Sequence, residues 1–285
     1  MLSPQSRLLP DGRRLHLHHG PIDLIIEVWG DARATAYTAA TERFQTILQE
    51  LADELPALRT EARVGRTFDG PTARRMQAAV APYAETAFVT PMAAVAGAVA
   101  DEILAAMTGA AAFDKAYVNN GGDTAFHLAH GERIDAHIAA STPGRITVHD
   151  DSPHRGIATS GWQGRSHSLG IADSVSVVAD GAAAADVAAT LIANAVDLPD
   201  HPEVRRTPAR ELSPDSDLGA RLVTTAVGHL TDGDVSQALD KGTQCARHTL
   251  ARGLIAGALL IMGTAVRHVG MADQIDISER TPLNA

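Results

Sequence analysis

The chain of 285 residues is predicted to have an α+β fold, with a mainly antiparallel sheet and helices packed on one side of it. Three observations carry this prediction. Segments with a two-residue period lie near the N-terminus and between residues 116 and 178. Alanine-rich segments with helical spacing separate and follow them. Tight turn signals, such as Gly20-Pro21 and Asn120-Gly121, join neighbouring strands as in antiparallel hairpins.

In the N-terminal part, residues 15–28 form two strands, because the alternation of Leu15 to His18 breaks at Gly20-Pro21 and resumes at Ile22. Helical spacing then predicts a helix over residues 34–55, which Pro56 ends. Further helices are predicted over 71–83 and 92–107, each opened by a proline, and Gly109 ends the second.

From residue 116 the period changes to two, which predicts strands on both sides of residue 121 and at 133–139, 145–149, 157–159 and 174–178. A helix is predicted over 182–196. Proline and charge make 199–216 an exposed connector, and two helices come after it at 218–230 and 235–262, the second interrupted near Gly253 or Gly257. We expect one domain over residues 1–270, in which two intimately packed lobes would divide near residues 110 and 200, and a flexible tail at 271–285.

Composition excludes several classes of function. A net charge of −10 argues against a nucleic-acid binder, which needs clustered Lys and Arg. The single cysteine, Cys245, excludes an internal disulfide and a thiolate metal cluster. The apolar segment 254–266 is too short to cross a bilayer, so we expect a cytoplasmic protein with no membrane partner. The small residues between Ala93 and Ala100 suit close backbone approach across a dimer, so a homodimer is expected.

The polar residues between Gly156 and Thr190 are the most informative part of the chain. Asp186 and Thr190 are four residues apart, so on a helix their oxygens point to one side and could offer two ligands to a magnesium ion. Alternatively, Asp186 offsets a helix dipole and Thr190 bonds back to a carbonyl. The residues alone favour this second interpretation.

Three phrases in this order resemble the ApbE superfamily, whose founding members move FMN from FAD onto a protein threonine. They are Thr90-Pro-Met-Ala-Ala-Val-Ala-Gly-Ala-Val-Ala-Asp101, Val118-Asn-Asn-Gly-Gly-Asp123, and Gly156-Ile-Ala-Thr-Ser-Gly-Trp-Gln-Gly-Arg-Ser166 running into Gly170-Ile-Ala-Asp173. A sister group of unknown function is more similar to this chain than the founding members are, and the similarity spans roughly residues 10–270. It implies an ApbE-like fold.

The resemblance also implies a site. Its magnesium ligands would be the Ala96 carbonyl, Asp186 and Thr190, and the ligand would be FAD or another flavin or nucleotide. The remaining pocket residues that it suggests, together with Met92 from the third helix, are Asn119, Asn120, Gly121, Gly122, Asp123, Thr159, Ser160 and Gly161. Turn chemistry explains the two asparagines equally well, and a place in the core explains Met92.

The chain departs from the transferases at two points. The lysine of their Ala-x-Ala-Lys-Gly phrase is missing, and their His-x-x-Asp-Pro segment is contracted to residues 165–173, which makes flavin transfer to protein doubtful. His167 and Asp173 could inherit acid–base catalysis, and Arg165 could clamp a diphosphate. Exposed loop positions are the alternative for these side chains.

These residues leave three hypotheses open. The first is a magnesium-dependent transferase or hydrolase acting on a flavin or nucleotide diphosphate. The second is an enzyme of a different pathway, acting on a non-flavin heterocycle through His167 and Asp173. The third is a non-catalytic ligand-binding protein.

Overall fold

The computed structural model describes residues 3–138, 144–271 and 275–277. The described chain divides into two compact units. Unit 1 comprises residues up to 134 with 149–158 and 179–187, and unit 2 comprises 135–148, 159–178 and the residues from 188 onward. The backbone passes repeatedly from one unit to the other, so the boundaries differ from the division expected near residues 110 and 200.

Unit 1 contains an antiparallel sheet built mainly from the N-terminal half of the chain. Its strands, in spatial order, are β1 (Gln5–Leu8), β2 (Leu15–His19), β3 (Ile22–Trp29), β4 (Lys115–Asn120), β5 (Asp123–Leu128) and the first residues of β8 (Gly156–Ser160). On β2 and β3 alternate side chains such as Leu17, Leu24 and Ile26 are fully buried, as a sheet with one covered face requires.

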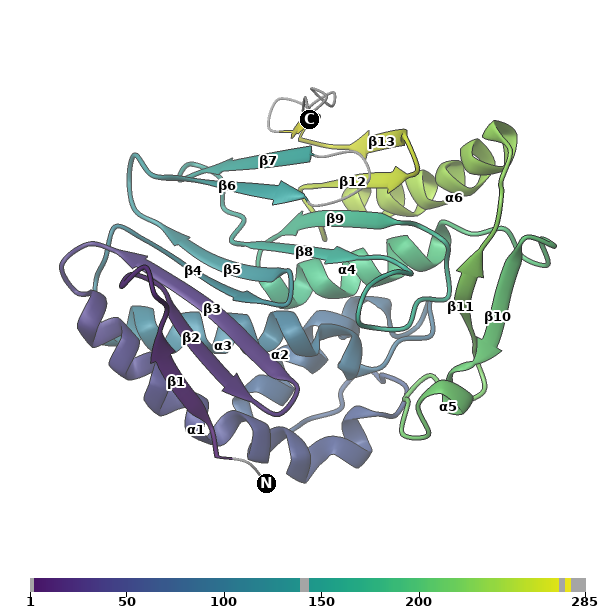
Figure 1. Cartoon of the computed structure of the whole chain (residues 1–285). Coiled ribbons are helices and arrows are strands. Elements are labelled where there is room, and N and C mark those ends of the chain that lie inside the picture. The colour runs from purple at the N-terminus through teal and green to yellow at the C-terminus, as the bar shows by residue number, and fades with distance from the viewer. Residues whose placement is uncertain (1–2, 139–143, 272–274, 278–285) are drawn as a thin grey trace. The chain divides into compact units, whose positions relative to one another are not determined.

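The helices of unit 1 cover one face of this sheet (Figure 1). They are α1 (Arg33–Leu58), α2 (Pro71–Val80) with the short helix η1 (Ala81–Tyr83), and α3 (Val95–Ala110), which comes after the short helix η2 (Pro91–Ala94). Phe44 and Ile47 of α1 and Ile103 of α3 are fully buried. Across the helices, Arg43 and Arg75 both pair with Glu102, at 2.8 and 2.7 Å.

Residues 91–110 are apolar enough, by length and composition, to pass for a membrane span. In the structure this segment packs against α1, α2, β4 and β5, and its buried residues include Ala98, Val99 and Met107. The core helix of a folded domain has the same composition, so the segment is weak evidence for a membrane.

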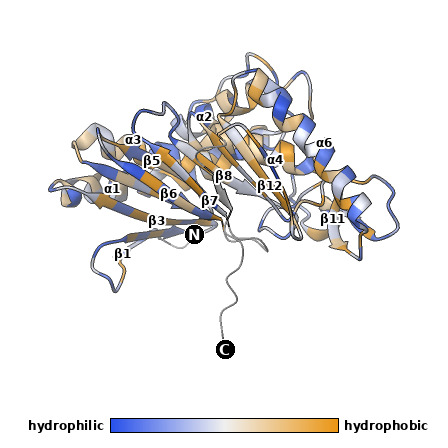
Figure 2. Ribbon diagram, turned by 90° about the horizontal axis from the view of Figure 1, so that it is seen from above, coloured by the Kyte–Doolittle hydropathy of each residue, from blue (hydrophilic) through white to orange (hydrophobic). Residues whose placement is uncertain are grey.

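Unit 2 contains three groups of antiparallel strands. One runs in the order β9 (Ser174–Ala179), β12 (Gly257–Met262), β13 (Ala265–Val269). A second has β14 (Ile275–Ile277), β7 (Gly144–His149) and β6 (Arg133–Ile138), and the third pairs β10 (Val204–Pro208) with β11 (Leu222–Val227). Figure 2 shows the hydrophobic residues of β12, all buried, beside the mixed surface of α6 (Asp232–Ala251), which packs on β12 and β13.

Helix α4 (Ala182–Ala195) begins in unit 1 and ends in unit 2. The side chains of Ala182, Ala185, Val187 and Ala188 are buried. The short helix α5 (Ala209–Leu212) connects β10 and β11, so the segment predicted as an exposed connector has a strand and a helical turn of its own.

Two C-terminal predictions were wrong. Residues 218–230, predicted as a helix, contain strand β11, whose Val223, Thr224 and Thr225 are β-branched. The predicted helix 235–262 ends at Ala251, and Gly253, with a φ of +70°, lies just beyond it as a helix terminator. The apolar run after Gly257 is the buried strand β12. A short apolar run does not distinguish a buried strand from a buried helix.

The predicted fold class is confirmed: antiparallel sheet and helices make up the structure, with the helices of unit 1 on one face of its sheet. Of the segment expected as a flexible tail, residues 275–277 form β14, and 272–274 and 278–285 lie outside the described residues.

Candidate functional site

The first turns of α3 and α4 meet in unit 1, and a carboxylate of each helix accepts hydrogen bonds from backbone N–H groups of the other. Asp186, in the second turn of α4, accepts a hydrogen bond from the backbone N–H of Gly97 at 3.0 Å. Asp101, in the second turn of α3, accepts from the N–H groups of Ala182 and Ala183, each at 2.9 Å. Each helix therefore supplies an acceptor to N–H groups at the start of the other, groups that have no partner within their own helix.

Gly97 permits this close approach. A Cβ atom at this position would lie 2.2 Å from the Ala182 carbonyl oxygen and 2.6 Å from the Ala183 nitrogen. Both are backbone atoms, so no side chain could swing away to make room. Glycine is therefore required by packing, and the small-residue surface noted in the sequence serves contact within the chain at this point.

The turn between β4 and β5 lies against the same helix start. Asn120, which is 5% exposed, donates from Nδ2 to the Ala96 carbonyl oxygen at 3.1 Å. Gly121 and Gly122 come next with φ of +66° and +121°, a conformation that favours glycine, and both are exposed. Asp123 is buried at the start of β5. Asn119 instead donates to the Thr124 hydroxyl at 2.7 Å.

The electrostatics of this cluster centre on Asp186. Burial raises the pKa of Asp186 well above its usual range, the negative charge of Asp123 raises it further, and the N–H of Gly97 offsets only part of this effect. Burial likewise raises the pKa of Asp101, against the hydrogen bonds from Ala183 and Ala182. The cluster therefore has negative charge that the neighbouring groups compensate incompletely.

These donors fit a hard cation in part. A carboxylate and a carbonyl oxygen are the ligands that magnesium prefers, and a divalent charge would relieve the repulsion around Asp186. The Ala96 oxygen already accepts from Asn120, so a cation bound there would have to share that oxygen. Throughout residues 3–138, 144–271 and 275–277, no group of three His, Cys, Asp or Glu side chains could hold a metal ion. Backbone and hydroxyl oxygens would thus be needed.

Thr190 lies one helical turn after Asp186 on α4, with a partly exposed side chain. Met92 lies in η2, also partly exposed. The structure thus brings Ala96, Asn120, Asp123 and Asp186 together in unit 1.

The other predicted residues belong to unit 2. Thr159 shares a hydrogen bond with Ser176 at 2.7 Å, and Ser160 is partly exposed. Gly161 is buried against the backbone of Asp173, whose oxygen would lie 2.2 Å from an added Cβ. Close packing within the unit thus explains Gly161.

Asp173 has a structural role in unit 2. Its carboxylate accepts from the indole Nε1 of Trp162 at 3.2 Å and from the N–H of Gly263 at 2.7 Å. These bonds fasten the loop after β8 to the turn between β12 and β13. If Asp173 accepted a proton from a ligand, that proton would compete with both hydrogen-bond donors for the carboxylate.

Arg165 and His167 lie at the exposed part of the same loop. Beyond them, the Ser168 hydroxyl and the Leu169 N–H both donate to Asn194 Oδ1, at 3.2 and 2.9 Å, and Arg206 donates to the Leu169 carbonyl. The loop is therefore held at its C-terminal side, and these two side chains extend from an anchored segment.

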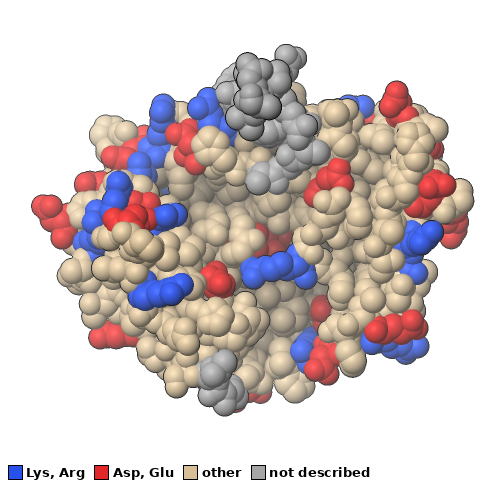
Figure 3. Space-filling view, viewed as in Figure 1, with Lys and Arg blue, Asp and Glu red and all other residues tan. Residues whose placement is uncertain are grey.

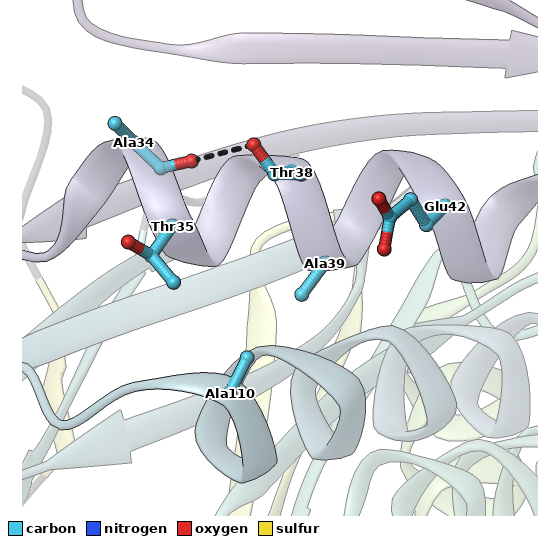
Figure 4. A pocket seen from close by; sticks show the side chains of 6 residues that line it. All are labelled: Ala34, Thr35, Thr38, Ala39, Glu42 and Ala110. Atoms are coloured by element: carbon cyan, nitrogen blue, oxygen red, sulfur yellow. Dashed lines mark hydrogen bonds between the residues drawn. The ribbon is translucent and has the colours of Figure 1, made fainter.

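A separate open hollow of about 380 Å³ lies in unit 1 (Figure 4). Its lining residues are Ala34, Thr35, Thr38, Ala39, Glu42 and Ala110. Ala110 ends α3 and lies thirteen positions beyond Gly97 along the helix, which is about 20 Å. The hollow is thus distinct from the Asp186 cluster. On the face in Figure 3 acidic and basic side chains are interspersed among the described residues.

Asp101 is the residue of this cluster to which the sequence alone gave no role. Its spacing was the available signal: Asp101 lies four residues beyond Gly97, just as Asp186 lies four residues beyond Ala182. Because side chains on a helix tilt toward its N-terminus, both carboxylates point back to the start of their own helix.

Comparison with known proteins gives matches to a protein family, to a protein sequence and to a solved structure. The family described as AbpE bacteria matches residues 6–271. A UPF0280 protein of Methanopyrus kandleri is 33% identical over 176 residues, which are 60% of this chain and 68% of that protein. The apo crystal structure of Pseudomonas stutzeri flavinyl transferase ApbE aligns with a TM-score of 0.45 and 11% identity, over 95% of this chain and 96% of that one. The family match and the UPF0280 relative confirm the resemblance found in the sequence phrases.

Proposed function

Because the chain belongs to the AbpE bacteria family, we propose that it binds a flavin or related nucleotide diphosphate and acts on it as a magnesium-dependent transferase or hydrolase. The observation that carries the proposal is the position of Asp186. Its carboxylate lies at the first turn of α3, beside the glycine turn after Asn120, with too little positive charge around it.

Bound magnesium supplies positive charge that polarises a phosphate oxygen and offsets the charge of a diphosphate. Asp186 and the Ala96 carbonyl are the residues proposed to hold it, with Thr190 as a third oxygen. Asn120 orients the Ala96 carbonyl through its 3.1 Å hydrogen bond. Gly121 and Gly122 are exposed residues, and their backbone N–H groups are proposed to face the phosphates, since a glycine turn lets a ligand approach the backbone closely.

Arg165 and His167 are proposed to act on the ligand as diphosphate clamp and acid–base group, and each is tested by its own substitution. Both are exposed, so Arg165→Ala and His167→Ala are expected to leave stability unchanged. For Asp173, its two N–H donors favour a role in holding the loop.

The test is a titration of purified protein with FAD, followed by flavin fluorescence, with magnesium and with EDTA. Chromatography of the same mixtures would detect FMN and AMP. We expect binding that requires magnesium and is lost in Asp186→Asn, while Asp234→Asn, which alters a carboxylate at the start of α6, binds as wild type. FAD binding that is equal in EDTA and magnesium would contradict the metal role. If FAD did not bind at all, a flavin would be excluded as the ligand.

A non-flavin heterocycle is the second candidate. The missing lysine and the contracted segment at residues 165–173 favour it. The lysine belongs to the transferase phrase that supplies a carbonyl to magnesium, and the contracted segment replaces the motif implicated in their catalysis. A thermal-shift screen with nucleotides, pterins and other N-heterocycles separates the two candidates. A non-flavin compound that stabilises the protein while FAD does not would replace the first proposal.

A further inference from the structure

We infer that Asp101 is a positioning residue for the Asp186 site, holding the start of α4 against α3 so that the Asp186 carboxylate stays beside Gly97 and Ala96. This inference rests on the proposed function only for its metal; the exchange of carboxylates itself is a property of the fold.

The start of α4 is held by Asp101, which binds two successive N–H groups, one with each carboxylate oxygen. Such charge-assisted bonds are short and strong, and the positive end of the helix dipole favours a carboxylate there. Gly181 is part of the same contact, since an added Cβ would lie 3.1 Å from Asp101 Oδ2. The first turn of α4 is thus bound to one residue of α3.

Asp186 lies one turn further along α4 and depends on the same contact. It is four residues beyond Ala182, so its carboxylate points back toward the segment that Asp101 holds. There it meets the N–H of Gly97 at 3.0 Å. The hydrogen bonds of Asp101 and the hydrogen bond of Asp186 lie on either side of the close backbone contact between Gly97 and Ala182. A shift of α4 that broke the bonds to Asp101 would therefore also draw Asp186 away from Gly97.

If Asp101 positions α4, its removal should affect other groups than if Asp101 only stabilises the start of that helix. A carboxylate that merely stabilises a helix start would affect only the groups it touches. Asp101 touches Ala182 and Ala183, whereas Gly97 is bonded by Asp186. An effect of Asp101 on the Gly97 N–H is therefore expected through the position of α4. An effect on a cation at Asp186 also contains the negative charge of Asp101, which helps to raise the pKa of Asp186 directly.

The experiment combines two readouts on Asp101→Ala, Asp101→Asn and the control Asp234→Ala. Asp234 also accepts at a helix start, in the capping box of α6 with Thr231, and belongs to unit 2. Amide hydrogen exchange of the metal-free proteins, resolved by residue with NMR, reports on Gly97. Manganese, as a paramagnetic substitute for magnesium, is titrated alone and followed by electron paramagnetic resonance.

We expect faster exchange at Gly97 in Asp101→Ala and manganese affinity lowered by about tenfold or more, the range typical of residues that support a metal ligand. Asp101→Asn keeps one acceptor and should lie between Asp101→Ala and wild type. Asp234→Ala should change neither readout, even if it lowers the melting temperature as much.

The outcomes distinguish the two ideas. Unchanged exchange at Gly97 in Asp101→Ala would overturn the positioning role, whatever happens with metal. A second outcome is faster exchange at Gly97 in the variant while the wild-type protein binds no manganese. This outcome would contradict the metal in the proposed function and in the role of Asp101, and would leave only a coupling between the two helix starts. Manganese binding that is the same in wild type and Asp101→Ala would overturn the inference and leave the proposed function standing.

Discussion

Gly97→Ala tests the helix contact on which the candidate site depends. The added methyl group would lie 2.2 Å from the Ala182 oxygen and 2.4 Å from the Ala182 carbon, whereas ordinary contacts begin near 3.4 Å. The first turns of α3 and α4 would thus have to separate by about 1 Å to restore a normal contact distance. That movement would stretch the bonds from Asp186 and Asp101 across the contact.

The expected cost combines three terms. Overpacking against backbone costs about 1–3 kcal/mol or more, and a weakened hydrogen bond to a charged group about 1.5–3 kcal/mol. Alanine is better than glycine in a helix by about 1 kcal/mol, which offsets part of this loss. We therefore expect the free energy of unfolding to fall by about 2–5 kcal/mol.

Gly109→Ala is the matched control, because it makes the same substitution in the same helix where an added Cβ meets nothing within 4 Å. It should be neutral or stabilising, by up to about 1 kcal/mol. Urea denaturation followed by circular dichroism measures both variants. If Gly97→Ala were as stable as Gly109→Ala, the close contact between the helices would be wrong, and the exchange of carboxylates with it.

Three further predictions concern single carboxylates. Burial, and then the charge of Asp123, raise the pKa of Asp186 in the folded state, so the wild-type protein loses stability as pH rises above the ordinary value of 3.8. In EDTA, the stability of Asp186→Asn relative to wild type should therefore increase from pH 4 to 8. A difference in unfolding free energy that does not change with pH in urea denaturation would contradict this. Burial opposes ionisation of Glu102, but hydrogen bonds from its two arginines outweigh it and lower the pKa, so stability from this group is present above the ordinary value of 4.5 and is lost as pH falls through the lower folded pKa. Glu102→Gln should accordingly lower the free energy of unfolding by about 1–3 kcal/mol at pH 7, and by less in acid. Thermal melts that show no difference from wild type at pH 7 would contradict a stabilising role for these ion pairs. Asp173→Asn keeps only one of two acceptors, so Trp162 fluorescence should shift to the red with a loss of about 1 kcal/mol, and an unchanged spectrum would argue against the anchored loop.

The sequence predicted the N-terminal half of the fold well, because its signals were local. Alternation around Gly20 located β2 and β3, and prolines located the starts of α2 and η2. In the C-terminal half the signals competed. The run after Gly257 was apolar enough for either a helix or a strand, and only its place beside β9 decides for the strand.

The candidate site shows the same limit. Asp186 and the glycine turn could be singled out from residue types and from the family resemblance. That Asn120 donates to the Ala96 carbonyl, and that Asp101 binds the start of α4, depend on contacts between segments 24 and 81 residues apart. No local pattern encodes such pairs. Asp173 likewise suggested catalysis by its place in the segment that replaces the transferases' His-x-x-Asp-Pro motif, whereas its donors come from Trp162 and the distant turn at Gly263.

The proposed site requires that a metal at Asp186 lie next to the diphosphate of a bound flavin. Phosphorus NMR of FAD with substoichiometric manganese, in the presence of the protein, measures this through paramagnetic broadening of the two phosphate resonances. We predict strong broadening with wild type, beyond that of FAD and manganese alone, and none of this excess with Asp186→Asn. Equal broadening with both proteins would contradict this prediction.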